Sequence, residues 1–296
     1  MIVGHQKIWQ FLTKAAELQK LSHAYLFSGQ EKLGKKTLAR EFVKWLFQDD
    51  NSNLSAHPDF IFVEPLQKEI KIAQIRDLIW RLQLSPLNSS FKTAIIDQAH
   101  CLNQEAQSAL LKTLEEPKGN TLLILVSEYP ETLFSTILSR LQRIKFHPVK
   151  RKEVEDYLKR KELPANKIKE ILDISQGKVG LAVDLALQPQ KLKEREEKIK
   201  ELRKIIVSPL AFRFQYIKDL TVNQSNLKEL LENWLVFFRK ELLSRLLGPS
   251  QNSFLGQEYS KKKLQNILWQ IQNLIFLLQN TNINTRLALE KLVMEF

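Results

Sequence analysis

Residues 28–42, SGQEKLGKKTLAREF, come close to the sequence of a nucleotide-binding loop. Such a loop has a glycine, four residues, a second glycine and a lysine, followed at once by serine or threonine. Gly29, Gly34 and Lys35 fit this pattern, but Lys36 stands at the hydroxyl position. An apolar run precedes the loop and a helix is expected to begin near Lys36, which is the context in which backbone N–H groups hold phosphate oxygens.

The hydroxyl after the lysine normally coordinates Mg²⁺. Lys36 cannot do this, because an ammonium has no lone pair and its charge opposes a nearby cation. Thr37 is no substitute, since the next helical position points about 100° away. The residues therefore predict a loop that keeps its fold without organising magnesium.

A second part of an ATPase site is also altered. The third predicted strand ends at Asp97, where an acidic residue holds Mg²⁺ in working ATPases of this kind. Gln98 follows, where many such enzymes have a glutamate that activates water; loss of a general base costs on the order of 10²–10⁴ in rate. We therefore expect a degenerate, non-hydrolysing fold, whose candidate nucleotide-binding residues are Gly29, Gly34, Lys35, Thr37 and Asp97.

Short apolar runs alternate with helical patterns in the first half of the chain. The runs occupy residues 24–28, 60–63, 93–97, 122–127 and 144–146. Their uninterrupted apolar character predicts parallel strands buried on both faces of an open α/β sheet. Between them, residues 71–84 have one apolar face, and Asn103 can cap a helix that Pro117 ends.

The second half is helical throughout. Residues 149–187 predict three short helices with breaks at Pro164 and Gly177, and residues from about 190 to 296 predict longer helices. The wide apolar stripes favour the core of a helical bundle, part of which could meet a neighbouring subunit. Their large side chains include Trp234, Phe237, Phe238, Trp269, Ile275 and Phe276.

Composition bounds the class of protein. A chain of 296 residues suits two or three domains. The single cysteine, Cys101, cannot form an internal disulfide, and no apolar run reaches about 18 residues, so we expect a cytoplasmic protein with no membrane partner. The formal charge of +12 makes an anionic partner such as DNA plausible. Much of the excess lies in lysine-rich helices, where a solvated face is the simpler explanation.

Several motifs together resemble one family. They are GHQ (4–6), HAYLFSG (23–29), HPD (57–59), IAQIRDL (72–78), ALLKTLEEPKGNTLLILVS (109–127), TILSR (136–140) and NINTRLALEKLV (282–293). With these motifs the chain resembles, from end to end, the delta prime family of bacterial DNA polymerase III clamp-loader subunits, which are AAA+ proteins.

The resemblance implies three domains and several partners. The domains are a RecA-like AAA+ domain with a parallel sheet (1–148), a helical lid (149–188) and a helical collar for oligomerisation (189–296). The implied partners are delta and gamma/tau subunits in a hetero-pentamer, with primer-template DNA and the sliding clamp contacted through the complex. Zinc is not expected, because residues 48–56 lack the cysteines that many family members carry before His-Pro-Asp.

The family's Ser-Arg-Cys motif carries an arginine finger that enters the ATP site of an adjacent gamma/tau-type subunit. Here the motif reads Ser139-Arg140-Leu141, so leucine replaces cysteine and Arg140 is the implied finger. An arginine supplied in trans is worth roughly 10³–10⁵ in rate. The resemblance also places Gly180 where active relatives have a nucleotide-sensing arginine, and Ser127 where they have a polar γ-phosphate sensor.

No cofactor is required by this interpretation, although ATP or ADP could sit in the loop without hydrolysis. Two other functions remain open from the sequence. An active gamma/tau-type ATPase would need turnover despite Lys36 and Gln98. A free-standing basic DNA-binding protein would need salt-sensitive DNA affinity from the chain alone.

Overall fold

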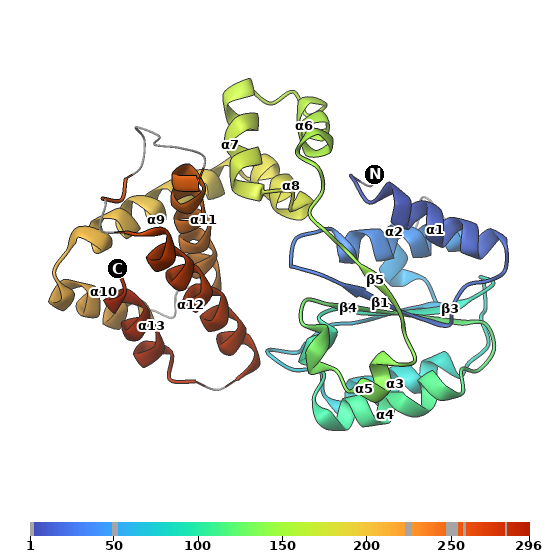
Figure 1. Cartoon of the computed structure of the whole chain (residues 1–296). Helices are drawn as coiled ribbons and strands as arrows, with labels where there is room; N and C mark the ends of the chain where they lie inside the picture. Colours follow the sequence, from blue (N-terminus) through green and yellow to red (C-terminus); the bar gives the residue numbers. More distant parts are fainter. Residues whose placement is uncertain (1–2, 49–52, 223–226, 247–253, 257–258, 282) are drawn as a thin grey trace. The chain divides into compact units, whose positions relative to one another are not determined.

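The structure, a computed structural model of the whole chain, describes residues 3–48, 53–222, 227–246, 254–256, 259–281 and 283–296. The chain divides into two compact units, Met1–Leu187 and Gln188–Phe296 (Figure 1). The first unit combines a sheet with helices, and every element described in the second is a helix. The predicted class, α/β followed by all-α, is confirmed.

Five parallel strands form the sheet of the first unit, in the order β2-β3-β4-β1-β5. Their bounds are β1 Ala24–Ser28, β2 Phe60–Val63, β3 Lys92–Ile96, β4 Thr121–Ser127 and β5 Gln142–Lys145. Parallel neighbours need crossover connections, which place helices over the faces of the sheet. Figure 1 shows α1 and α2 on one face and α3, α4 and α5 on the other. Those helices span α1 Gln6–Glu17, α2 Lys35–Phe47, α3 Ile72–Leu82, α4 Gln104–Glu115 and α5 Ser135–Leu138.

Alternate residues of each central strand enter different cores. Phe27 and Ile124 pack with the apolar residues of α1 and α2. Leu26 and Leu125, their neighbours in sequence, pack with those of α3 and α4. Both faces of the sheet are therefore buried, which explains the uninterrupted apolar runs in the sequence.

Three strands differ from their predicted bounds, β4 only in that it begins at residue 121 instead of 122. β3 ends at Ile96, one residue before the predicted Asp97, and Gln98 has a left-handed backbone (φ 49°) that turns the chain away. β5 spans 142–145 instead of 144–146. It is an edge strand with three exposed polar residues, so hydrophobicity marks only its second half.

The predicted cap at Asn103 and the helix predicted over residues 71–84 are both confirmed. Asn103 caps α4, and its Oδ1 accepts a hydrogen bond from the backbone N–H of Ala106 at 2.9 Å. The helix predicted over 71–84 is α3. Three short 3-10 helices complete the connections: η1 Leu54–Ala56, η2 Ala99–Cys101 and η3 Pro130–Thr132.

Three short helices follow the sheet, as predicted: α6 Arg151–Lys159, α7 Ala165–Ser175 and α8 Val179–Leu187. Gly177 separates the last two with a φ of +84°. A Cβ atom there would lie 2.5 Å from the carbonyl oxygen of Val149, so only glycine fits this close approach.

The second unit is built from α9 Pro189–Val207, α10 Leu210–Val222, α11 Leu227–Leu246, α12 Lys261–Asn280 and α13 Thr285–Met294. Trp234 and Phe238 are completely buried in its core, as the apolar stripes predict. Trp269 differs, because 63% of its surface is exposed. Arg213 donates to the carbonyl oxygens of Ser208, Ile206 and Val293, and so ties α9 to α13.

The boundary between the two units falls after Leu187. The finer division into residues 1–148, 149–188 and 189–296 stays a prediction. Across the described part of the chain, the structure contains no helix with the length and apolarity needed to cross a membrane.

Candidate functional site

The candidate nucleotide loop connects the end of β1 to the start of α2. Its two glycines adopt φ values of +140° (Gly29) and +89° (Gly34), a region in which other residues are strained. A Cβ atom on Gly29 would also lie 2.6 Å from the carbonyl oxygen of Phe146. The glycines thus shape the turn whether or not phosphate binds.

Lys35 bonds to its own loop. Its Nζ donates to the carbonyl oxygens of Gly29 and Gln30, both at 2.5 Å. The residue is only 7% exposed, and burial lowers the pKa of the Lys35 ammonium to about 8. In a working loop this lysine reaches the terminal phosphates; here its donors are directed to backbone carbonyls.

Acidic groups surround that lysine. Glu128, Glu31 and Asp97 raise the pKa of Lys35 against the larger effect of burial. The backbone N–H of Glu31 donates to Oε1 of Glu128 at 3.3 Å, so a loop N–H already has an internal carboxylate as acceptor. A phosphate entering here would meet like charge as well as an occupied donor.

Lys36 contacts the carboxylates of Asp97 and Glu64. Its Nζ is 2.9 Å from Oδ2 of Asp97 and 3.4 Å from Oε2 of Glu64. The same ammonium lies 4.7 Å from the centre of the Phe62 ring. The Asp97 side chain is 11% exposed, so its charge is balanced mainly inside the protein. These residues do not fit Mg²⁺, because a fixed cation already holds the carboxylates.

The other predicted residues of this site lie apart from the loop interior. Thr37 lines a surface hollow together with Arg40 and Lys44. Gln98 is exposed. Ser127 is buried at the end of β4, and its hydroxyl has no hydrogen-bond partner among the described residues. The structure therefore brings Gly29, Gly34 and Lys35 together in the loop, and it places Asp97 close enough to affect Lys35 and in contact with Lys36.

The helix α8 is joined to the loop at Gly180. The backbone N–H of Gly180 donates to the carbonyl oxygen of Lys32 at 2.7 Å. Nζ of Lys32 forms an ion pair with Asp184 at 2.6 Å. A Cβ atom on Gly180 would lie 2.9 Å from the same carbonyl oxygen, so a side chain at this position would push α8 away from the loop.

Arg140 lies just after α5, and Figure 1 shows α5 on the face of the sheet opposite α2. Nη2 is 2.7 Å from Oε1 of Glu115, and Nη1 donates to the carbonyl oxygen of Thr136 at 2.7 Å. Nη1 also lies 3.4 Å from Oγ of Ser139, which is exposed. The Arg140 side chain is 34% exposed, so it is at the surface while contacting its own domain.

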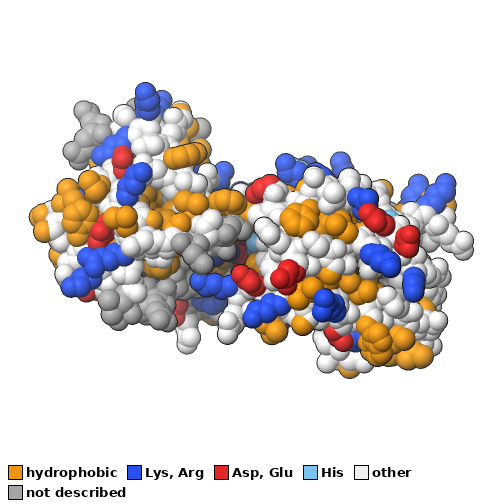
Figure 2. Space-filling view, turned by 90° about the horizontal axis from the view of Figure 1, so that it is seen from below, with side chains coloured by type: hydrophobic (Ala, Val, Ile, Leu, Met, Phe, Trp, Pro, Cys, Tyr) orange, Lys and Arg blue, Asp and Glu red, His pale blue; other side chains and the backbone are white. Residues whose placement is uncertain are grey.

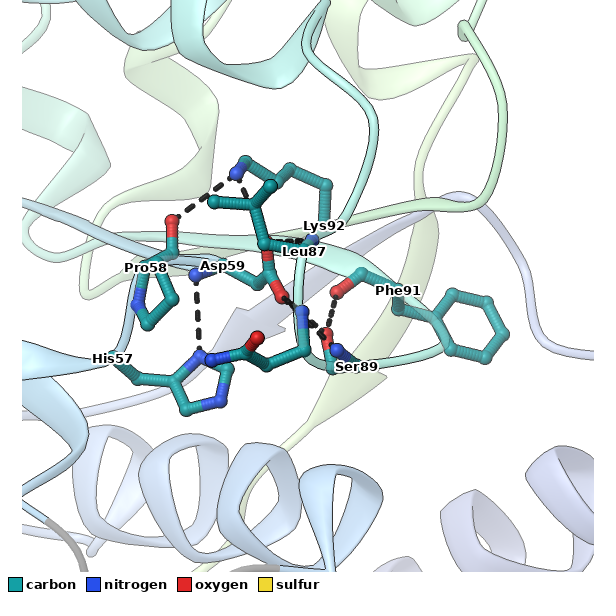
Figure 3. A network of polar contacts seen from close by, with 8 residues as sticks. His57, Pro58, Asp59, Leu87, Ser89, Phe91 and Lys92 are labelled. Carbon is teal, nitrogen blue, oxygen red and sulfur yellow. Dashed lines mark hydrogen bonds and ion pairs between the residues drawn. The ribbon is translucent and has the colours of Figure 1, made fainter.

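A buried polar network that the sequence analysis missed holds the entry to β2 (Figure 3). Asp59 is completely buried and accepts five hydrogen bonds. The donors are the N–H groups of Leu87, Asn88 and Ser89, the Ser89 hydroxyl and the Lys92 ammonium. Burial alone would raise the pKa of Asp59, but these donors outweigh it and hold that pKa well below its usual value.

Lys92 also donates to the carbonyl oxygen of Pro58 at 3.1 Å, and Nδ1 of His57 accepts from the N–H of Asp59 at 3.1 Å. The sequence signal was present but divided: the HPD motif (57–59) stands directly before one apolar run, and Lys92 stands directly before another. The network supports the fold and lies within one domain, so it explains a motif without adding a reactive group.

Residues 4–150, about half of the chain, match the family model described as DNA polymerase III, delta subunit. The chain belongs to that family. It is similar to DNA polymerase III subunit delta' of Bacillus subtilis, at 26% identity over 97% of this chain and 94% of the relative. It is also 32% identical to subunit delta' of Pseudomonas aeruginosa, over 46% of this chain and 45% of the relative. The chain is thus a delta'-like subunit of the DNA polymerase III clamp loader.

The tau subunits among the relatives match about half of the chain. DNA polymerase III subunit tau of Escherichia coli is 32% identical over 49% of this chain, which spans 24% of that relative. Among solved structures, a DNA polymerase III gamma subunit-related protein from Thermotoga maritima has a TM-score of 0.59 at 20% identity, covering 96% of this chain and 97% of its own. That likeness concerns the fold.

For metals, the described residues contain no group of three or more His, Cys, Asp or Glu side chains able to hold an ion. Residues 49–52 of the segment 48–56, in which zinc is not expected, lie outside the described residues. The candidate nucleotide loop of this delta'-like chain therefore has Lys35 bonded to loop carbonyls and Lys36 paired with Asp97, and Arg140 lies outside that loop.

Proposed function

We propose that this chain is a clamp-loader subunit that does not hydrolyse ATP and that supplies Arg140 to the ATP site of a neighbouring subunit. One observation carries the first half of the proposal: the Lys36 ammonium lies 2.9 Å from Asp97, the carboxylate that would otherwise hold Mg²⁺. Without that cation, the charge that develops on the transferred phosphoryl group has no counter-ion. Gln98 adds a second defect, because an amide cannot accept a proton from water.

The loop needs no nucleotide to keep its shape. Lys35 is bonded to two loop carbonyls, and Lys32 is held through Gly180 and Asp184. These contacts give the Lys35 and Lys32 ammonium groups acceptors within the protein, in place of the phosphate oxygens of a working site. We therefore propose no required cofactor; ATP or ADP binding without hydrolysis would have to displace them.

Arg140 is the residue proposed to act in catalysis, on a neighbour's ATP. Its guanidinium is at the surface, next to the exposed Ser139, and outside its own nucleotide loop. A fixed positive charge placed against a γ-phosphate stabilises the charge that spreads in the transition state. The role is catalysis in trans, with no turnover by this chain.

The proposed partners follow from the relatives, which are named as delta' and tau subunits of DNA polymerase III. We propose assembly with delta and gamma/tau-type subunits into a hetero-pentamer that meets primer-template DNA and the sliding clamp. Figure 2 shows Lys and Arg side chains spread among hydrophobic and acidic ones on the face in view. On this face the basic side chains form no continuous patch, so the face in view gives no support to a free-standing basic DNA-binding protein.

The test is DNA-stimulated ATPase activity of the complex reconstituted from this chain and its delta and gamma/tau partners. Arg140→Ala should abolish the share of turnover from the site it completes, because such a finger is worth roughly 10³–10⁵ in rate. Arg76→Ala, an exposed arginine of α3, is the matched control and should retain full activity. Equal rates for wild type and Arg140→Ala would remove the finger from the proposal.

Assays on the isolated chain test the proposal that it does not hydrolyse ATP. Turnover by the chain alone that disappears in Lys35→Ala would establish an active ATPase and contradict the proposal. Salt-sensitive DNA binding by the chain alone would favour a free-standing DNA-binding protein.

A further inference from the structure

Arg140 and Glu115 join the ends of two helices. Glu115 is the last residue of α4, and Arg140 lies two residues after the end of α5. The ion pair between Nη2 and Oε1 measures 2.7 Å, and Thr136 accepts from Nη1 at the same distance. The guanidinium is thereby held against its own domain.

This contact opposes the use of Arg140 on a phosphate. A carboxylate at 2.7 Å offsets the guanidinium charge and would repel an incoming phosphate. The N–H that faces Oε1 cannot bond to both anions in full geometry. To act on a neighbour's phosphate, Arg140 has to exchange one anion for the other.

The exchange is feasible because the pair is at the surface. The side chains of Arg140 and Glu115 are 34% and 49% exposed, so water screens their attraction and can solvate either partner. The ion pair therefore holds Arg140 in this position but can be broken at little cost. A phosphate of higher charge than a carboxylate can displace Glu115.

From this geometry we propose that Glu115 is a positioning residue that keeps Arg140 on its own domain until a phosphate of a nucleotide-bound neighbouring subunit replaces the carboxylate. This inference rests on the proposed finger role of Arg140. If so, the Arg140–Glu115 ion pair weakens docking to the neighbouring subunit, and it does not change the ATPase rate of the docked complex. Removing the Glu115 charge should strengthen productive docking about two- to fivefold, equivalent to about 0.4–1 kcal/mol.

The experiment titrates this chain into its delta and gamma/tau partners and measures DNA-stimulated ATPase activity. For Glu115→Gln, the concentration giving half of the maximal rate should fall about two- to fivefold, while the maximal rate stays at the wild-type value. Glu116→Gln is the matched control, since it removes the same charge one residue further on and no ion pair joins Glu116 to Arg140. It should leave both quantities unchanged.

The double variant Glu115→Gln with Arg140→Ala separates this proposal from the finger itself. If Glu115 acts through Arg140, the double variant should match Arg140→Ala in both quantities. A shift that persists without Arg140, an equal shift in Glu116→Gln, a lowered maximal rate in Glu115→Gln, or no shift at all would overturn the role of Glu115 while leaving the finger intact. A wild-type maximal rate in Arg140→Ala would instead overturn the finger, and the role of Glu115 with it.

Discussion

Nζ of Lys36 lies 2.9 Å from Oδ2 of Asp97, so a side chain of the first helical turn after the loop neutralises the carboxylate that follows β3. The two residues are 61 positions apart in the sequence. The ammonium also faces Glu64, which follows β2. One ammonium of the chain itself therefore lies against both carboxylates.

Replacing this internal cation should restore metal-dependent nucleotide binding. In Lys36→Thr the carboxylate of Asp97 becomes available and a hydroxyl stands at the expected position, so ATP affinity in the presence of Mg²⁺ should rise about tenfold or more, about 1.4 kcal/mol. Titration calorimetry with and without Mg²⁺ measures it. Lys44→Thr, two turns further along α2, is the control and should change nothing. Equal ATP affinity of Lys36→Thr and wild type would show that Lys36 is not the obstacle.

The burial of Lys35 predicts a pH dependence of stability. The pKa of Lys35 is about 8 in the folded protein and near 10.5 when unfolded, so between these values the unfolded chain binds more protons. The contribution of Lys35 to the free energy of unfolding therefore rises with pH over this window, by about 1–3 kcal/mol. Denaturation of wild type and Lys35→Met should be measured at pH 7.5 and at pH 10. The free energy of unfolding of wild type, relative to that of the variant, should be higher at pH 10.

Lys14→Met, at an exposed position of α1, is the matched control for exchanging a lysine for a methionine. Its difference from wild type should be the same at both pH values. If Lys35→Met behaves in the same way, the buried ammonium does not titrate in this window.

Asp59 should dominate the stability of the β2–β3 edge. Asp59→Asn would leave the Lys92 ammonium buried, with a side-chain exposure of 5%, without a compensating charge, and breaking a buried pair in this way costs about 3–5 kcal/mol. Because the pKa of Asp59 is lowered by folding, its contribution is complete above its usual pKa near 3.8 and decreases as the pH falls below that value. Urea denaturation of Asp59→Asn measures the loss. Asp77→Asn, whose ion pair with Arg81 is exposed, should lose less than about 1 kcal/mol.

Gly180→Ala should lower the free energy of unfolding, whereas most glycine-to-alanine substitutions within a helix raise it. Glycine to alanine within a helix usually stabilises by about 0.5–1 kcal/mol. Here the added Cβ would lie 2.9 Å from the carbonyl oxygen of Lys32, and a contact that forces the backbone to shift costs about 1–3 kcal/mol. The hydrogen bond from Gly180 to Lys32 should weaken as well. Faster amide exchange of residue 180 with lower stability would support this account; a stabilised variant would contradict it.

The local sequence determined most helices and strands of the first unit. It also determined which functional groups stand at the loop positions that would bind Mg²⁺ and activate water. Apolar runs mark strands buried on both faces, and Asn103 marks a helix start, because these signals depend on a few neighbouring residues. Lys36 and Gln98 exclude Mg²⁺ coordination and proton acceptance by their own functional groups, whatever surrounds them. Edge strand β5 was less well predicted, since one apolar residue in four carries little periodicity.

Only the tertiary structure decided how the charged residues pair. The pairs Lys36–Asp97, Lys92–Asp59 and Arg140–Glu115 join residues 61, 33 and 25 positions apart, respectively. No local pattern predicts them, because strand order and helix layers set which side chains meet. The same reason explains Gly180, whose lack of a side chain has meaning only beside Lys32. The sequence thus shows which functional groups stand at each loop position, and only the fold shows which ion pairs those groups form.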